Sequence, residues 1–134
     1  MNPSSRFILP RTGHILANRS VLAAMTNKQS NEDGTLSDEE IKWLVRRAKS
    51  GFAITTTAAA NVTEHGRGWE GEMGVWGDHQ LPGLAELAKQ LNETGTLSLA
   101  QIFHGGMRAP QSLNGVQPVS ASENTEDGMD GLYT

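Results

Sequence analysis

The most informative absence in this 134-residue sequence is cysteine, of which there is none. No disulfide framework, zinc-thiolate site or thiol nucleophile can therefore form. Long hydrophobic runs are missing too: near the N-terminus, Phe7, Ile8 and Leu9 are followed at once by Pro10. That run is too short for a signal peptide or a membrane span, so we expect a cytoplasmic protein with no membrane partner.

Positive charge is also scarce. The chain has 11 lysines and arginines against 15 acidic residues, which gives a formal net charge of −4. An acidic chain without a dense basic patch has no general attraction to nucleic acid or to anionic lipid. We therefore expect no nucleic-acid partner.

Several catalytic motifs are missing as well. No serine is flanked as Gly-x-Ser-x-Gly, so covalent hydrolysis has no support. The four histidines have no partner at i+2 or i+4, and we expect no metal site. The stretch Gly66–Gly71 matches the glycine motif of dinucleotide-binding folds, but no strand ends directly before it and no amphipathic helix follows. We interpret this match as chance.

What the sequence does contain is two helix signals. Ser37-Asp38-Glu39-Glu40 is a capping box, in which the serine hydroxyl accepts from the Glu40 amide and Glu40 reaches back to the serine amide. The apolar positions of both predicted helices recur at helical spacing, and Gly51 and Gly95 mark their ends. These positions are Ile41, Leu44, Val45 and Ala48 in the first helix, and Leu84, Leu87, Ala88 and Leu91 in the second, after Pro82.

Three short apolar runs predict strands before, between and after the helices. They cover residues 21–25, 52–57 and 96–103, and a long glycine-rich connection covers 58–78. Strands that alternate with helices are typical of an α/β protein with parallel strands. We expect residues after Gly105 to be loop-like, with an acidic tail at Glu123, Glu126, Asp127 and Asp130.

Gln101 and His104 lie where the third predicted strand ends, beside Gly105 and Gly106. Functional groups of α/β proteins gather at the carboxyl ends of the strands. An amide that donates and accepts at once suits recognition of a heterocycle edge, although a buried amide can also serve only the loop backbone. We expect His104 to support the glycine turn.

These features recur in one register from Asn18 to Ala109. In order, they are Asn18-Arg19, Val21–Thr26, Asp33-Gly34, Arg47-Ala48-x-x-Gly51, Ala59 with Val62, Gly66-Arg67, and Gln101-x-x-His104-x-Gly106. The combination resembles the Old Yellow Enzyme family of NAD(P)H:flavin oxidoreductases. The resemblance implies a (β/α)8 TIM barrel that binds FMN, takes hydride from NADPH or NADH, and reduces a small-molecule substrate with an activated alkene.

The resemblance also implies roles for five positions. Ala24, Met25 and Thr26 would lie against the flavin ring, with the Thr26 hydroxyl tuning its reduction. Ala59 would let the ring approach the second strand, and Gln101 would grip its pyrimidine edge.

Three segments depart from the family pattern. Ala24 stands where a proline is usual, and Met107 where an arginine is usual, with Arg108 one place later. Lys28 and Gln29 follow Thr26 where many members have an aromatic lip. These departures concern the range of substrates more than the cofactor.

Length sets the extent of the expected fold. A complete barrel needs roughly 250 residues, so we expect a single partial domain over residues 1–134: an N-terminal portion of about three βα units. Residues 1–17 would form an arm or short hairpin, 18–109 the family-like core, and 110–134 a loop region. Open sheet edges would then favour a homo-oligomer or association with another chain.

Two alternatives to an oxidoreductase portion stay open. The chain could be a truncated, inactive barrel segment that binds flavin weakly or not at all, or that acts only with another chain. It could also be part of another barrel enzyme, one that handles phosphorylated metabolites.

Overall fold

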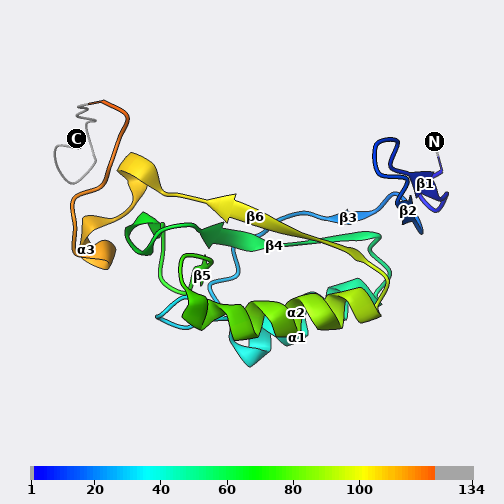
Figure 1. The fold of residues 1–134 in the computed structure, drawn as a ribbon, viewed down its shortest axis with the longest axis horizontal. Helices are drawn as coiled ribbons and strands as arrows, with labels where there is room; N and C mark the ends of the chain where they lie inside the picture. Colours follow the sequence, from blue (N-terminus) through cyan, green and yellow to red (C-terminus); the bar gives the residue numbers. More distant parts are fainter. Residues whose placement is uncertain (1, 123–134) are drawn as a thin grey trace.

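Residues 2–122 are described by a computed structural model, in which a parallel β-sheet carries two long helices on one face (Figure 1). The central strand is β4 (Ile54–Asn61), and β6 (Leu97–Phe103) pairs along one of its edges. The other edge of β4 pairs with β3 (Val21–Leu22) near its start and with β5 (Met73–Gly74) at its end. All these pairings are parallel, which confirms the predicted α/β class.

The first predicted helix is α1 (Asp38–Lys49). Its start is capped as expected, because the Ser37 hydroxyl accepts a hydrogen bond of 3.1 Å from the Glu40 amide. The other half of the predicted capping box is wrong: the Glu40 carboxylate accepts hydrogen bonds from the side chains of Asn27 and Ser30. The preceding loop folds against the first turn of the helix and brings these donors to the carboxylate.

The second predicted helix is α2 (Leu81–Glu93), which follows a short 3-10 turn, η2 (Asp78–Gln80). Pro82 lies in the first turn, where its missing N–H leaves no bond unmade. Leu87 and Leu91 are buried, whereas Ala88 is exposed and lines an apolar groove of about 350 Å³ between α2 and β6. The apolar face of α2 is therefore only partly covered by the described residues.

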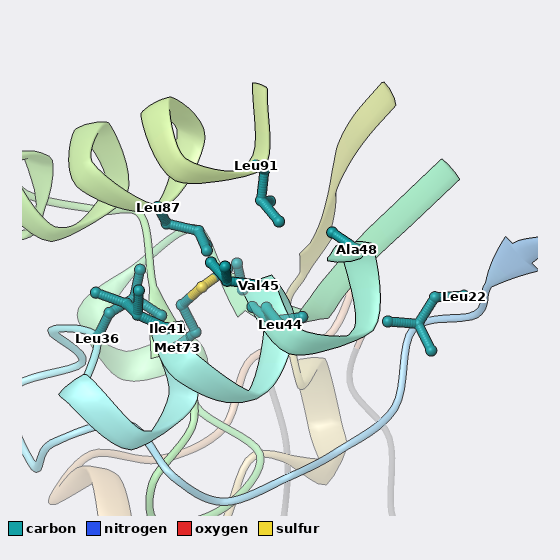
Figure 2. Close-up of a cluster of buried hydrophobic side chains, with 10 residues drawn as sticks. Leu22, Leu36, Ile41, Leu44, Val45, Ala48, Met73, Leu87 and Leu91 are labelled. Carbon is teal, nitrogen blue, oxygen red and sulfur yellow. The ribbon is translucent and has the colours of Figure 1, made fainter. Parts of the chain in front are cut away.

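The core lies between the two helices and the sheet (Figure 2). Leu44 of α1, Leu91 of α2 and Met73 of β5 are each 1% exposed, and Ala60 of β4 is fully buried beneath them. The small Ala60 lets the helices approach the middle of the sheet. Within residues 2–122, no helix combines the length and apolar character needed to cross a membrane.

A short hairpin precedes the sheet, one of the two arrangements that the sequence predicts for the N-terminal arm. β1 (Phe7–Ile8) pairs antiparallel with β2 (Ile15–Leu16). The guanidinium of Arg19 lies 4.7 Å from the centre of the Phe7 ring and ties the hairpin to the chain that enters β3. The hairpin lies at the end of the sheet where the strands begin (Figure 1).

Several predicted boundaries are wrong. The first strand ends at Leu22 instead of 25, and Val21 is 51% exposed because one face of the sheet is uncovered by described residues. The second strand continues to Asn61, since its alanines pair with β6. The predicted connection contains η1 (Glu64–Gly66) and β5, and the predicted loop region contains η3 (Gly106–Arg108) and α3 (Gln111–Asn114). The acidic tail at Glu123, Glu126, Asp127 and Asp130 lies outside the described residues.

Candidate functional site

Two of the predicted flavin residues are neighbours on adjacent strands. Ala59 of β4 pairs in register with Gln101 of β6. Side chains alternate along a strand, and the next residue, Ala60, points into the helix-covered core. Ala59 and Gln101 therefore share the opposite side of the sheet, which we call the open face.

A β-bulge sets this register. Thr56 pairs with Leu99 and Ala59 pairs with Gln101, so β4 uses one more residue than β6 between these pairs. The Thr57 hydroxyl occupies the irregular position, where it accepts a hydrogen bond of 3.2 Å from the Gln101 amide and donates one to the Ala58 carbonyl. If β4 alternated regularly from Thr56, Ala58 would lie opposite Gln101, Ala59 would point into the core and Ala60 would face away from it.

The polar groups of the candidate site are available to a ligand. The Gln101 side chain is exposed, and its side-chain amide has no hydrogen-bond partner among the described residues. Only the backbone N–H of Gln101 is bonded, to the Thr57 hydroxyl. Thr26 is likewise exposed, with no described partner for its hydroxyl. Ala59, by contrast, is 6% exposed and offers only a methyl group.

The segment Ala24–Thr26 follows β3 without joining the sheet. Leu22 is the last paired residue and lies opposite Thr55. Met25 is 47% exposed. The structure thus places Ala59 and Gln101 side by side on adjacent strands, whereas no pairing joins Ala24, Met25 or Thr26 to them.

The loop of residues 62–72, which we call the β4–β5 loop, joins the ends of the strands. The Gly66 carbonyl accepts from the Gly105 amide over 2.8 Å, and a Cβ on Gly66 would come within 2.7 Å of the His104 ring. The His104 Nδ1 accepts from the Gly106 amide over 2.8 Å, which supports the glycine turn as predicted. At Gly71, which closes the six-residue glycine motif, the chain continues toward β5 and not into a helix.

Sequence reasoning missed the buried carboxylate of this loop. Glu72 is 2% exposed, and its Oε2 accepts a hydrogen bond of 2.7 Å from the Gly68 amide. Burial raises the pKa of the Glu72 carboxyl to about 7, against the opposing effects of the Gly68 and Trp69 amides and of the Arg67 charge. No periodic pattern marks Glu72 in the sequence, because its burial depends on how the loop folds back.

Among residues 2–122, no group of three or more histidines, aspartates and glutamates lies close enough to hold a metal ion. At the candidate site, Gln101 and Thr26 offer neutral hydrogen-bonding groups beside the small Ala59, which suits an uncharged heterocycle.

Comparison with known proteins decides the family. Residues 12–131 match the sequence profile of the NADH:flavin oxidoreductase / NADH oxidase family. The chain belongs to this family. The predicted resemblance to the Old Yellow Enzyme family is thereby confirmed.

Among curated relatives, the chain is 35% identical to the probable NADH-dependent flavin oxidoreductase YqiG of Bacillus subtilis (strain 168), over 87% of the chain. It is 34% identical to the NADH:acrylate oxidoreductase of Vibrio harveyi, over 86% of the chain. The chain spans only 31% and 12% of the lengths of these two relatives.

Solved structures confirm the predicted partial barrel. The Old Yellow Enzyme homologue from Zymomonas mobilis superposes with a TM-score of 0.84 at 22% identity, covering 99% of this chain and 39% of that one. A 2-naphthoyl-CoA reductase complex superposes with a TM-score of 0.78 at 31% identity, covering 86% and 17%. This family member has the fold of the first part of a (β/α)8 TIM barrel.

Proposed function

We propose that this chain forms the first part of an FMN-dependent NAD(P)H oxidoreductase that reduces activated alkenes, such as unsaturated carbonyl compounds. The observation that carries the proposal is the pairing of Ala59 with Gln101 on the open face, in a chain of the flavin oxidoreductase family. A methyl group beside a free amide offers a flat ring both room to approach and a polar edge contact.

Each predicted residue has a role in this proposal. Gln101 holds the pyrimidine edge of the flavin, because its amide donates and accepts together. Thr26 donates from its hydroxyl to a flavin carbonyl and so tunes reduction, while Ala24 and Met25 lie against the ring. Ala59 leaves space for the ring at the second strand of the sheet.

FMN, when bound, would accept hydride from a nicotinamide and deliver it to the β-carbon of the polarised alkene. The protein contributes orientation and electrostatics. The relatives' names support a nicotinamide donor: NADH in the Bacillus subtilis and Vibrio harveyi proteins, and NADPH in the NADPH dehydrogenase of Listeria monocytogenes. We propose a small-molecule alkene as the second substrate.

A transplant experiment tests this proposal. Residues 1–134 would replace the matching segment of the Bacillus subtilis relative, so that the rest of a barrel is supplied. We expect a yellow protein that NADH bleaches without air, whereas the same relative with the segment deleted stays colourless. A folded, colourless chimera with no extractable flavin would contradict the proposal.

The second candidate function is a barrel segment that does not hold flavin alone and acts only with another chain. The short span of the relatives' lengths and the uncovered sheet face favour it. Titration of FMN with the isolated chain distinguishes the two, because bound flavin loses fluorescence when its ring stacks on protein. Stoichiometric quenching by residues 1–134 alone would contradict the second candidate.

A further inference from the structure

Glu40 holds an unusual position for a carboxylate at the start of a helix. It lies in the first turn of α1, where acidic side chains are normally exposed to solvent, yet it has no exposed surface. Its Oε1 accepts a hydrogen bond of 2.9 Å from Asn27, and its Oε2 accepts one from the Ser30 hydroxyl. Both donors belong to the turn of residues 27–30.

That turn directly follows Thr26 and has a constrained backbone. Lys28 adopts a φ of 53°, a left-handed conformation that non-glycine residues adopt at a cost. The Asn27 side chain also accepts from the Gln29 amide over 3.4 Å, so the same residue braces the turn from within. A turn strained in this way persists only where its surroundings hold it in place.

The β4–β5 loop holds the turn from the other side. The Ser30 amide donates to the Gly71 carbonyl over 3.2 Å, and a Cβ on Gly71 would come within 2.7 Å of the Lys28 carbonyl oxygen. β3 has already ended at Leu22, so the sheet ladder does not fix the residues that follow. The direction of the chain from Leu22 to the turn therefore depends on these anchors.

We propose that Glu40 is a positioning residue for the segment Ala24–Thr26. By holding Asn27 and Ser30 from beneath, it fixes the direction in which Met25 and Thr26 leave β3 and approach the open face. The link to flavin rests on the proposed function, whereas the link to the turn stands on the hydrogen bonds alone. Glu40 itself contacts no ligand in this role.

Hydrogen exchange of the isolated chain tests the structural step without flavin. Glu40→Gln keeps an acceptor for Asn27 and can donate to the Ser30 hydroxyl, so we expect exchange at residues 25–30 within about twofold of wild type. Glu40→Ala removes both bonds and should speed that exchange about tenfold or more, with little change in β4. Glu39→Ala, at the exposed neighbouring position, is the matched control and should change neither.

Two outcomes of the exchange measurement would overturn the proposal. An equal rise in exchange throughout the chain would assign Glu40 to global stability only and overturn the proposal, as would a Glu40→Gln variant no better protected than Glu40→Ala. If Glu40→Ala fails to fold, Ser30→Ala removes one of the two bonds from the loop side. Unchanged exchange at residues 25–30 in a folded Ser30→Ala variant would also overturn it.

FMN titration separates this inference from the proposed function. If wild type binds FMN, Glu40→Ala should weaken binding about tenfold at a temperature where all variants are folded, and Glu40→Gln should bind within about twofold of wild type. Unchanged affinity in Glu40→Ala would overturn the positioning role. If wild type binds no FMN, flavin binding by this chain alone fails, and the exchange measurement still decides the role of Glu40.

Discussion

Gln101 combines a side chain that we propose for flavin binding with a backbone that serves the fold. Its amide N–H is bonded to the Thr57 hydroxyl, whereas its side chain is exposed and without a described partner. Replacing the side chain therefore leaves the sheet pairing with β4 intact. A substitution at Gln101 therefore tests flavin recognition without disturbing the sheet.

We expect Gln101→Leu to weaken FMN binding by about 1 to 3 kcal/mol, or roughly 5-fold to 150-fold in Kd, because the polar edge of the flavin loses its partner. The measurement is a flavin fluorescence titration of the chimera described above. Gln111→Leu, an exposed glutamine in α3, is the matched control. Equal affinities for all three proteins would remove Gln101 from the flavin site.

Two glycines differ in the space around them, and this predicts opposite effects on stability. A Cβ on Gly74 would come within 1.8 Å of the Trp76 ring, whereas one on Gly83 would meet Leu36 at an ordinary 3.5 Å. We expect Gly74→Ala to lower the free energy of unfolding by about 2 kcal/mol or more, and Gly83→Ala in α2 to raise it by roughly 0.5 kcal/mol. Urea denaturation measures both, and a Gly74→Ala variant as stable as wild type would contradict the close packing at Gly74.

Among the structural elements, the β4–β5 loop contacts both the turn after Thr26 and the end of β6. It contacts the turn of residues 27–30 through Gly71 and the end of β6 through Trp69, whose ring centre lies 5.3 Å from that of Phe103. The Arg67 guanidinium donates to the Glu32 carbonyl over 2.8 Å and adds a third tie. The buried Glu72 closes this loop on itself.

We expect the Glu72 carboxyl to make stability depend on pH. Its pKa is raised from 4.5 to about 7 by burial, so the folded state favours the protonated form more strongly than the unfolded state does. The resulting stabilisation is present below about pH 4.5 and is lost as pH rises through about 7. Across that range we expect wild type to lose roughly 1 to 3 kcal/mol relative to Glu72→Gln.

Urea denaturation at several pH values between 5 and 8 measures this difference. Glu72→Gln keeps an oxygen to accept from the Gly68 amide but cannot ionise, so its pH profile reports the remaining groups. Glu70→Gln, at the exposed neighbouring carboxylate, serves as control and should follow wild type. Parallel profiles for wild type and Glu72→Gln would show that Glu72 is not the titrating group.

At the scale of the whole molecule, the sheet is covered on one side only. Both long helices lie on the same face, and no described element covers the other (Figure 1). On the open face Val21 and Leu99 are 51% and 46% exposed, and at the β6 edge Ile102 is 72% exposed. The outer edge of β6 has no partner strand among residues 2–122, and such an edge beside exposed apolar side chains is a surface on which chains associate.

We therefore expect the isolated chain to self-associate through β6. Ile102→Lys should shift the chain toward monomer in sedimentation velocity, because a lysine at an edge strand disfavours pairing with another chain. Val119→Lys places the same charge at a position that is 53% exposed but outside the sheet, and it should leave the association unchanged. A wild-type chain that is monomeric at every concentration tested would contradict this expectation.

The sequence alone determined the local elements of this protein. The Ser37 cap and the spacing of Ile41, Leu44 and Val45 specify α1, because helix caps and helical periodicity are encoded within a few residues. The same holds for the end of α2 at Gly95, which has the positive φ of 77° that favours glycine. The family resemblance added Ala59 and Gln101 as candidate flavin residues, and their roles stay a prediction.

Only the tertiary structure decided what depends on residues far apart in the chain. The bulge places Ala59, and not Ala58, opposite Gln101, because β4 uses one more residue than β6 between paired positions. Glu40 became a buried acceptor because the turn of residues 27–30 folds against α1, and Glu72 was buried by its own loop. No local pattern records such contacts, since the free energy that stabilises them comes from burial and from partners brought together by the whole fold.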